Sequence, residues 1–168
     1  MLRGDGLLID FVVPPLDTTI LASTHLLWVL SRHPEVWEEI VADPSPIPAA
    51  AVENVRIASP IRGFTRRLSC EHEIDGTRLP RGSRVVLLFG SANLDETRFP
   101  DPERYDIHRP NGAHLGWGNG PHACAGAILA KLEMHALPQA MVPRARRIAA
   151  GEPGDDVADL LREAEQVG

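Results

Sequence analysis

The segment 117–126, WGNGPHACAG, places one cysteine, Cys124, among three glycines and directly before an apolar pattern typical of a helix. Glycines let a backbone adopt positive φ values and approach a flat ligand closely. The N-terminus of the following helix favours negative charge, so it would stabilise a thiolate at Cys124. A thiolate presented by a tight loop has the chemistry and exposure that an axial ligand of haem iron requires.

Two other interpretations of this segment stay open at the level of sequence. The loop could be a glycine-rich turn before a helix, with Cys124 as a buried structural residue. His122 and Cys124 could also form half of a zinc site, but no other cysteine–histidine pair in the chain has the spacing of zinc ligands. A metal-binding or redox thiol protein without haem therefore lacks a second ligand.

A second feature of the sequence is a carboxylate and a guanidinium group on one predicted helix. Glu53 and Arg56 are three residues apart, so they share one face of a predicted helix. An exposed helix pair of this kind contributes only about 0.2–0.5 kcal/mol. Taken alone, the pair indicates no more than that.

Apolar periodicity and turn residues predict a mainly α-helical domain with a small β-sheet. The turns are expected at 75–76 and 80–82, and the proline-rich stretch 99–110 is expected to be an irregular loop. We expect Pro138 to interrupt the last core helix and residues 155–166 to form a solvated amphipathic helix. The predicted helices span 14–31, 34–41, 49–57 and 125–141, and the predicted strands span 63–68, 71–74 and 84–89.

Composition narrows the class of protein. The 168 residues fit one domain with a substantial core, and the net charge of −6, without a basic run, argues against nucleic-acid binding. Two cysteines, Cys70 and Cys124, are too few for a disulfide framework. The apolar run 7–13 is too short to span a membrane and lacks the flanks of a secretion signal. We therefore expect a cytoplasmic protein.

The segment 117–126 resembles the haem-binding loop of the cytochrome P-450 family, with Trp117 where the family usually has phenylalanine. Motifs similar to those of the family occur in the family's order over residues 7–148. Residues 91–95 resemble an Ala-Asn-Arg-Asp segment, with Leu94 in place of the arginine. The resemblance implies the carboxyl-terminal half of a bacterial-type member, with a domain over 1–150 and a divergent polar tail over 151–168.

The same resemblance gives the charged pair a role. Glu53 and Arg56 match the family's Glu-x-x-Arg helix pair, and residues 99–110 resemble a loop whose arginine joins that pair in a buried network. Either Arg104 or Arg109 would be this third partner. We expect the network to support the thiolate loop structurally.

The implied cofactor is haem b, with Cys124 as the proximal iron ligand. His122 and Arg66 match positions that meet the haem propionates, and carboxylates favour such charge-assisted donors. Arg66 could instead be a surface arginine on an edge strand. The other loop residues implied to bind the cofactor are Trp117, Gly118 and Gly126.

Asp17 and Thr18 match an acid and an alcohol that relay protons in the family. A carboxylate beside a hydroxyl suits this role, because each can exchange protons through water. Alternatively, both residues merely stabilise the start of an exposed helix.

Pro14 and Pro15 replace two small residues of the family's oxygen groove. Because an interior proline costs a helix about 3 kcal/mol, we expect this helix to begin at Pro14.

The resemblance implies a haem-thiolate monooxygenase that inserts one oxygen atom from dioxygen into a small organic substrate. Electrons would come from NAD(P)H through a ferredoxin or flavoprotein. The alternative is a truncated, inactive haem-binding fragment, or half of a split enzyme whose amino-terminal half is another chain. In that case we expect exposed apolar faces, carrying Trp28, Leu30 and Trp37.

Overall fold

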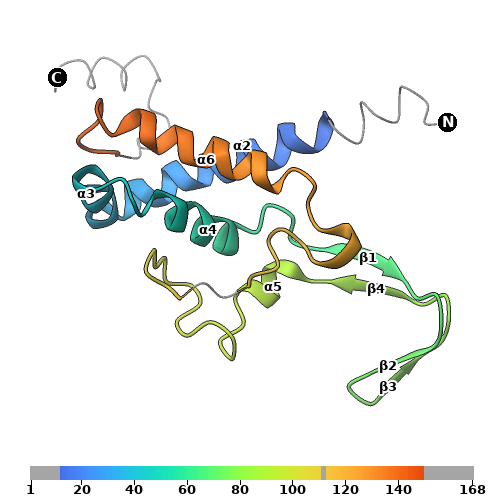
Figure 1. Ribbon diagram of the computed structural model, residues 1–168. Coiled ribbons are helices and arrows are strands. Elements are labelled where there is room, and N and C mark those ends of the chain that lie inside the picture. Colours follow the sequence, from blue (N-terminus) through green and yellow to red (C-terminus); the bar gives the residue numbers. More distant parts are fainter. Residues whose placement is uncertain (1–11, 111–112, 150–168) are drawn as a thin grey trace, which may run out of the picture.

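Helices dominate the computed structural model, which describes residues 12–110 and 113–149 (Figure 1). The α2 and α6 helices run along one side of the molecule, and α4 lies between them and the strands (Figure 1). The prediction of a mainly helical fold is confirmed. The helices are α2 (Val13–Arg32), α3 (Pro34–Ala42), α4 (Ile47–Ala58), the short α5 (Phe89–Asn93) and α6 (Ala127–Met141), together with the 3₁₀ turn η1 (Gly120–His122).

The strands form two separate two-stranded antiparallel sheets. Phe64 pairs with Leu87 in the first sheet, which joins β1 to β4. The second sheet is a hairpin whose turn residues, Asp75 and Gly76, have φ values of 47° and 73°. Positive φ at both positions is the requirement of the tight hairpin turns that Asp-Gly favours. The strands are β1 (Phe64–Arg67), β2 (His72–Ile74), β3 (Thr77–Leu79) and β4 (Arg84–Leu87).

The core lies where α2, α4 and α6 pack together. The buried residues of α2 recur at i, i+4, i+7 and i+8, which is the spacing of one helix face. From α6, fully buried Met134 joins the same cluster. These residues of α2 are Ala22, Leu26, Val29 and Leu30.

The expected exposure of three apolar residues is only partly found. Trp28 is 54% exposed, but Leu30 and Trp37 are buried. Trp37 is covered because α3 folds back against α2, and its indole Nε1 donates a hydrogen bond of 3.2 Å to the carbonyl oxygen of Ala145. The prediction was wrong for Leu30 and Trp37, because the described helices cover each other's apolar faces.

Prolines mark where the helices begin. Pro14 and Pro15 occupy the first turn of α2, where the N–H group that proline lacks would have no partner within the helix. Pro138 does not interrupt α6, which continues to Met141. So close to the helix end a proline disturbs little of the hydrogen-bond ladder, and its carbonyl oxygen still accepts from Val142 N at 3.0 Å.

Two expectations lie outside the described residues: most of the apolar run 7–13 and the amphipathic helix over 155–166. Among the helices of the described ranges, none combines the length and apolar character that crossing a membrane requires.

The core face of α2 leads to a first prediction. Leu26→Ala should lower the free energy of unfolding by about 2–5 kcal/mol, because it leaves a cavity beside fully buried neighbours. The matched control Leu16→Ala, 60% exposed on the same helix, should change it by less than about 0.5 kcal/mol. Urea unfolding of the cofactor-free chain measures both, and equal losses would contradict the assignment of the core face.

Candidate active site

A tight loop presents Cys124 at the surface, just before α6. A turn closes where Gly118 N donates to the carbonyl oxygen of Leu115 at 2.9 Å, and Cys124 N donates to the carbonyl oxygen of Trp117 at 2.8 Å. The thiol group is free and solvent-exposed. The interpretation of Cys124 as a buried structural residue therefore does not fit its place in the loop.

Glycines in this loop have distinct physical roles. Gly118 and Gly120 have φ values of 67° and 68°, where a side chain is strained. At Gly116 a Cβ atom would lie 2.7 Å from Val55 Cγ1, so the loop backbone packs directly against α4. Gly126 has a negative φ, and a Cβ there would lie 4.0 Å from Cys124 Sγ.

Trp117 closes the loop on the side of α6. Its ring is half-buried, and the ammonium group of Lys131 lies 5.6 Å from the ring centroid. Within the described residues its indole Nε1 is buried and has no acceptor. The tryptophan thus serves as a flat apolar wall that also attracts a cation.

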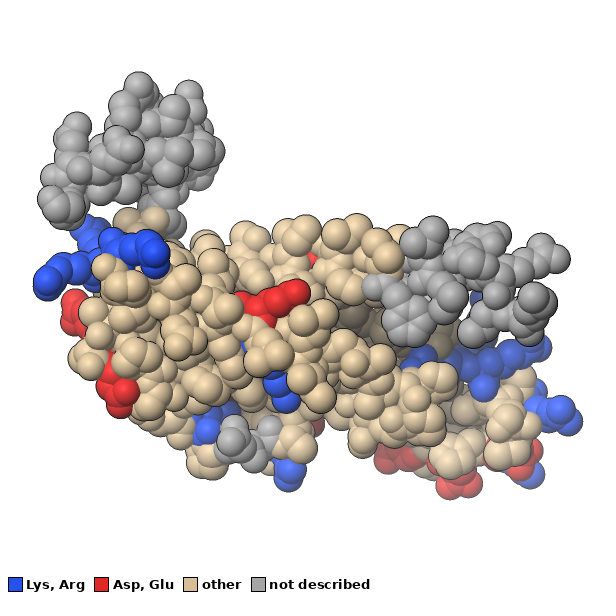
Figure 2. Space-filling model, turned by 45° about the horizontal axis from the view of Figure 1, so that its top comes forward, with Lys and Arg blue, Asp and Glu red and all other residues tan. Residues whose placement is uncertain are grey.

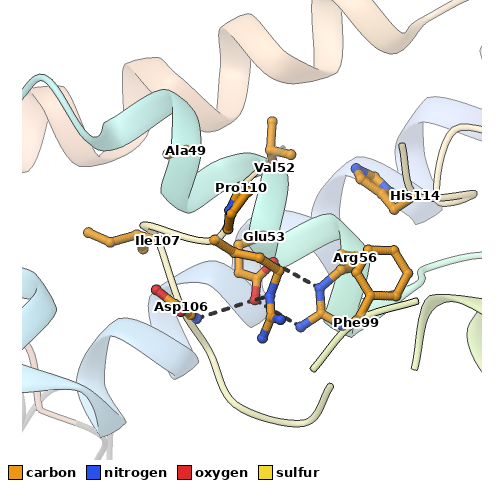
Figure 3. A pocket seen from close by; sticks show the side chains of 10 residues that line it. Ala49, Val52, Glu53, Arg56, Phe99, Asp106, Ile107, Pro110 and His114 are labelled. Atoms are coloured by element: carbon orange, nitrogen blue, oxygen red, sulfur yellow. Dashed lines mark hydrogen bonds and ion pairs between the residues drawn. The ribbon is translucent and has the colours of Figure 1, made fainter. Parts of the chain in front are cut away.

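Glu53 and Arg56 form a buried, bidentate ion pair on α4 (Figure 3). Arg56 Nε and Nη2 each donate to a different oxygen of the Glu53 carboxylate at 2.8 Å. Their exposed fractions are only 5% and 2%. The Arg56 guanidinium also lies 5.1 Å from the centroid of the Phe99 ring. The pair is therefore not the exposed helix pair that the spacing alone indicates.

The loop 99–110 supplies a second arginine to this carboxylate. Arg109 Nε donates to Glu53 Oε1 at 3.0 Å, and Asp106 N donates to the same oxygen at 3.2 Å. The guanidinium of Arg104 does not join them; only its carbonyl oxygen accepts, from Arg56 Nη2 at 3.5 Å and from Arg109 Nη2 at 3.1 Å. Of the two arginines considered from sequence, the structure brings Arg109 to the pair.

The cavity beside this network is too small for a substrate. Its volume is about 20 Å³, and Glu53, Arg56 and His114 are among the residues that line it (Figure 3). A cavity of that size holds about one water molecule. The network is therefore packed support rather than a binding pocket.

Arg66 and His122 carry donor groups that form no ion pair among the described residues. Arg66 is half-buried on β1, and its Nη1 donates to the carbonyl oxygen of Thr65 at 3.1 Å. Among the described residues no carboxylate forms an ion pair with it. His122 is exposed at the end of η1. Both side chains keep donors available for an anionic group.

Asp17 and Thr18 lie close to the start of α2. Thr18 is half-buried, and its hydroxyl donates to the carbonyl oxygen of Pro14 at 2.9 Å, whereas Asp17 is exposed. No hydrogen bond joins these two side chains within the part of the chain that the structure describes. The threonine proton is therefore committed to the helix backbone, while the carboxylate faces solvent.

The surroundings of Cys124 suit a flat, apolar macrocycle with two carboxylates. The thiol is exposed, Gly118 leaves the backbone approachable, and Arg66 and His122 offer donors for carboxylates. Figure 2 shows a face on which uncharged residues predominate, with Lys and Arg at both ends and in smaller patches between them. These residues fit haem. The large apolar side chains left exposed include Leu16, Ile20 and Leu21 on α2, Ile128, Leu129 and Leu132 on α6, and Phe64 and Val86 on the β1–β4 sheet.

His114 connects the network to the thiolate loop. Its Nδ1 accepts a hydrogen bond of 3.0 Å from Gly116 N. Burial lowers the pKa of His114 below its ordinary value, repulsion from Arg56 and Lys131 lowers it further, and the Glu53 carboxylate opposes this shift. The neutral ring is thus the form that the folded chain stabilises.

The sequence assigned no function to two polar residues of the site. Asn93 and Ser59 are buried and hydrogen-bonded to each other, between the charged network and the thiolate loop. The resemblance of residues 91–95 to a family segment marks Asn93, but gives no function for it. For Ser59 the sequence offers no signal beyond its place at the end of a helix.

Comparisons with known proteins point to one family. The family model described as "Cytochrome P450" matches residues 47–144. Cytochrome p450 CYP199A2 of Rhodopseudomonas palustris is 38% identical over 137 residues, which cover 82% of this chain and 32% of that protein. Linalool 8-monooxygenase of Pseudomonas putida is 33% identical over 131 residues, which cover 78% of this chain and 32% of that protein.

Solved structures show the same relation. The heme domain of a Tepidiphilus thermophilus P450 superposes with a TM-score of 0.80 at 37% identity, over 92% of this chain and 38% of that one. The chain spans about a third of the length of the curated relatives it matches.

Removing the buried carboxylate should destabilise the chain strongly. Glu53→Gln leaves two buried or half-buried arginines without their counter-ion, and should lower the free energy of unfolding by about 3–5 kcal/mol. The control Glu71→Gln removes the partner of Arg78 in an exposed pair, and should cost less than about 1 kcal/mol. Denaturant unfolding distinguishes them; similar losses would mean that the buried pair contributes no more than a surface pair.

The His114 pKa leads to a prediction about pH. A histidine whose pKa is lowered by folding binds fewer protons when folded, so stability falls as the pH decreases below about 6.5. His114→Asn should make that loss less steep between about pH 7 and pH 5. Unfolding curves at several pH values measure the slope, with His72→Asn as the exposed control. An unchanged slope in His114→Asn would contradict the role of burial.

Proposed function

The chain belongs to the cytochrome P450 family, and from that premise we propose that it forms the thiolate-bearing part of a haem monooxygenase. The substrate would be a small organic molecule, and the reaction would insert one oxygen atom from dioxygen into it. Electrons from NAD(P)H would arrive through a ferredoxin or flavoprotein. Residues 1–150 would form the haem-binding unit, and 151–168 a polar tail.

One observation carries this proposal: an exposed cysteine stands on a hydrogen-bonded loop between a buried charged network and a helix N-terminus. Cys124 Sγ is accessible, while the loop backbone before it is held by short hydrogen bonds and by close packing against α4. A structural thiol needs no such exposure, and no group of three or more candidate metal-binding side chains exists among the described residues. The thiolate of Cys124 would bind the iron and donate electron density to it.

Arg66 and His122 would hold the cofactor's carboxylates. Arg66 has no carboxylate partner of its own among the described residues, and half-burial strengthens its interaction with an anion. His122 lies two residues from Cys124, so the same loop would fix the thiolate and one carboxylate together. When bound, haem b supplies the iron chemistry that activates dioxygen.

Asp17 and Thr18 would move protons. The exposed Asp17 carboxylate can take a proton from solvent, and Thr18 Oγ1, whose own proton is donated to Pro14, presents a lone pair. The exposed apolar side chains near the start of α2 would exclude water and contact the substrate. In this arrangement α2 would supply the proton-handling residues and the cysteine loop would supply the iron ligand.

A second candidate function is haem binding without turnover. The apolar residues exposed on α2 and α6 favour it, because they leave the thiol's surroundings open to water in the described chain. A cofactor bound at such an open surface would be exposed to water, and the described residues would not enclose a substrate beside it. In this case activity would depend on another chain that covers these helices.

Cys124→Ser tests the ligand assignment. In the parent chain, haem addition, reduction and carbon monoxide should give the strongly red-shifted Soret band of a thiolate ligand, and the variant should lose it. Cys70→Ser, which removes the other free and exposed thiol, should keep the band. Persistence of the band in Cys124→Ser, or its loss in Cys70→Ser, would contradict the assignment.

A further inference from the structure

Asn93 is a fully buried amide between the charged network and the thiolate loop. It is the last residue of α5, and its exposed fraction is 0%. Its side-chain Nδ2 donates to Ser59 Oγ at 2.9 Å, and its Oδ1 accepts from the backbone N–H of Leu115 at 2.6 Å. One side chain therefore joins the end of α4 to the start of the thiolate loop.

On the side of the network, Asn93 is held at two points. Its carbonyl oxygen accepts a hydrogen bond of 2.7 Å from Arg56 Nη1. The hydroxyl of Ser59, which accepts from the Asn93 amide, itself donates to the carbonyl oxygen of Arg56 at 2.9 Å. Arg56 in turn is fixed by Glu53. The position of Asn93 thus follows the buried ion pair.

On the side of the loop, the path from Leu115 to the cysteine is short. The carbonyl oxygen of Leu115 accepts from Gly118 N, and that of the adjacent Trp117 accepts from Cys124 N. Gly116 has no room to move toward Val55. A displacement of Leu115 would therefore be passed on to Cys124.

Asparagine suits this position for a chemical reason. Leu115 N–H requires an acceptor, whereas the Ser59 hydroxyl, which already donates to Arg56, requires a donor. An amide supplies one of each from a single planar group. Aspartate would place a second acceptor against Ser59, and alanine would supply neither group.

We infer that Asn93 is a positioning residue, which transmits the position of the buried Glu53–Arg56 pair to the loop that carries the iron ligand. The inference rests on the proposed function of Cys124. Asn93 acts on the ligand only through the backbone from Leu115 onward.

Hydrogen exchange of backbone amides tests the positioning in the full, cofactor-free chain. In the parent chain the Leu115 amide should exchange about as slowly as the amides of α4; exchange as fast as that of exposed Gly120 would overturn the inference. Asn93→Ala should speed exchange at Leu115, Gly118 and Cys124 by about fivefold or more, the equivalent of one lost hydrogen bond. The Asp43 amide at the end of α3 should be unaffected.

Ser59→Ala is the matched control, because it removes the partner of Nδ2 and leaves the bond from Leu115 N to Oδ1. It should leave exchange at Leu115 near the parent value. Equal acceleration in Ser59→Ala and Asn93→Ala, or acceleration that includes Asp43, would show a general loss of stability and overturn the inference.

The haem-loaded chain separates this inference from the proposed function. Asn93→Ala should convert part of the red-shifted carbon monoxide Soret band into the less shifted form of a lost or protonated thiolate. Faster loop exchange with an unchanged band would overturn the link to the ligand. A parent chain that gives no thiolate band would count against the proposed function. Hydrogen exchange at Leu115 would still test whether Asn93 positions the loop.

Discussion

The rest of the structure depends on neutralising one buried guanidinium group. Arg56 is 2% exposed, and a charge removed from water is costly unless it is paired and fully hydrogen-bonded. Glu53 supplies the counter-charge, and the carbonyl oxygen of Asn93 takes a further donor. Because these partners come from α4 and α5, the pair fixes two segments that are distant in sequence. Removing either partner would leave the other charge buried and unpaired, which is what makes the pair costly to break.

The same carboxylate organises the irregular loop 99–110. Arg109 reaches Glu53 and also donates to the carbonyl oxygens of Pro100 and Asp101, so one side chain satisfies backbone groups that no helix or strand pairs. The Tyr105 hydroxyl donates to the carbonyl oxygen of Ala50, and burial together with the Glu53 carboxylate raises the Tyr105 pKa. The loop is thus ordered by side chains instead of by secondary structure.

The sequence was most informative where local chemistry decides the outcome. The long helices were predicted to within a few residues, because apolar spacing and proline at a first turn act locally. The cysteine loop could be recognised because its glycines and its cysteine lie within ten residues of one another in the sequence. The failures had two causes. Trp37 is buried because α3 packs against α2, which no local pattern shows. α6 continues through Pro138 because that proline lies near the helix end. The bridge made by Asn93 joins residues far apart in the chain, so no local pattern predicts it.

Lys131 has a consequence for chemical modification. It is the only lysine of the sequence, and its ammonium group lies over the ring of Trp117, beside the cysteine loop. Reagents that acylate side-chain amines therefore have a single lysine target, one turn into the helix that follows Cys124. Acylation there would remove the cation from the indole face. The chain thus carries a built-in attachment point for a dye whose emission would report on the packing of this loop.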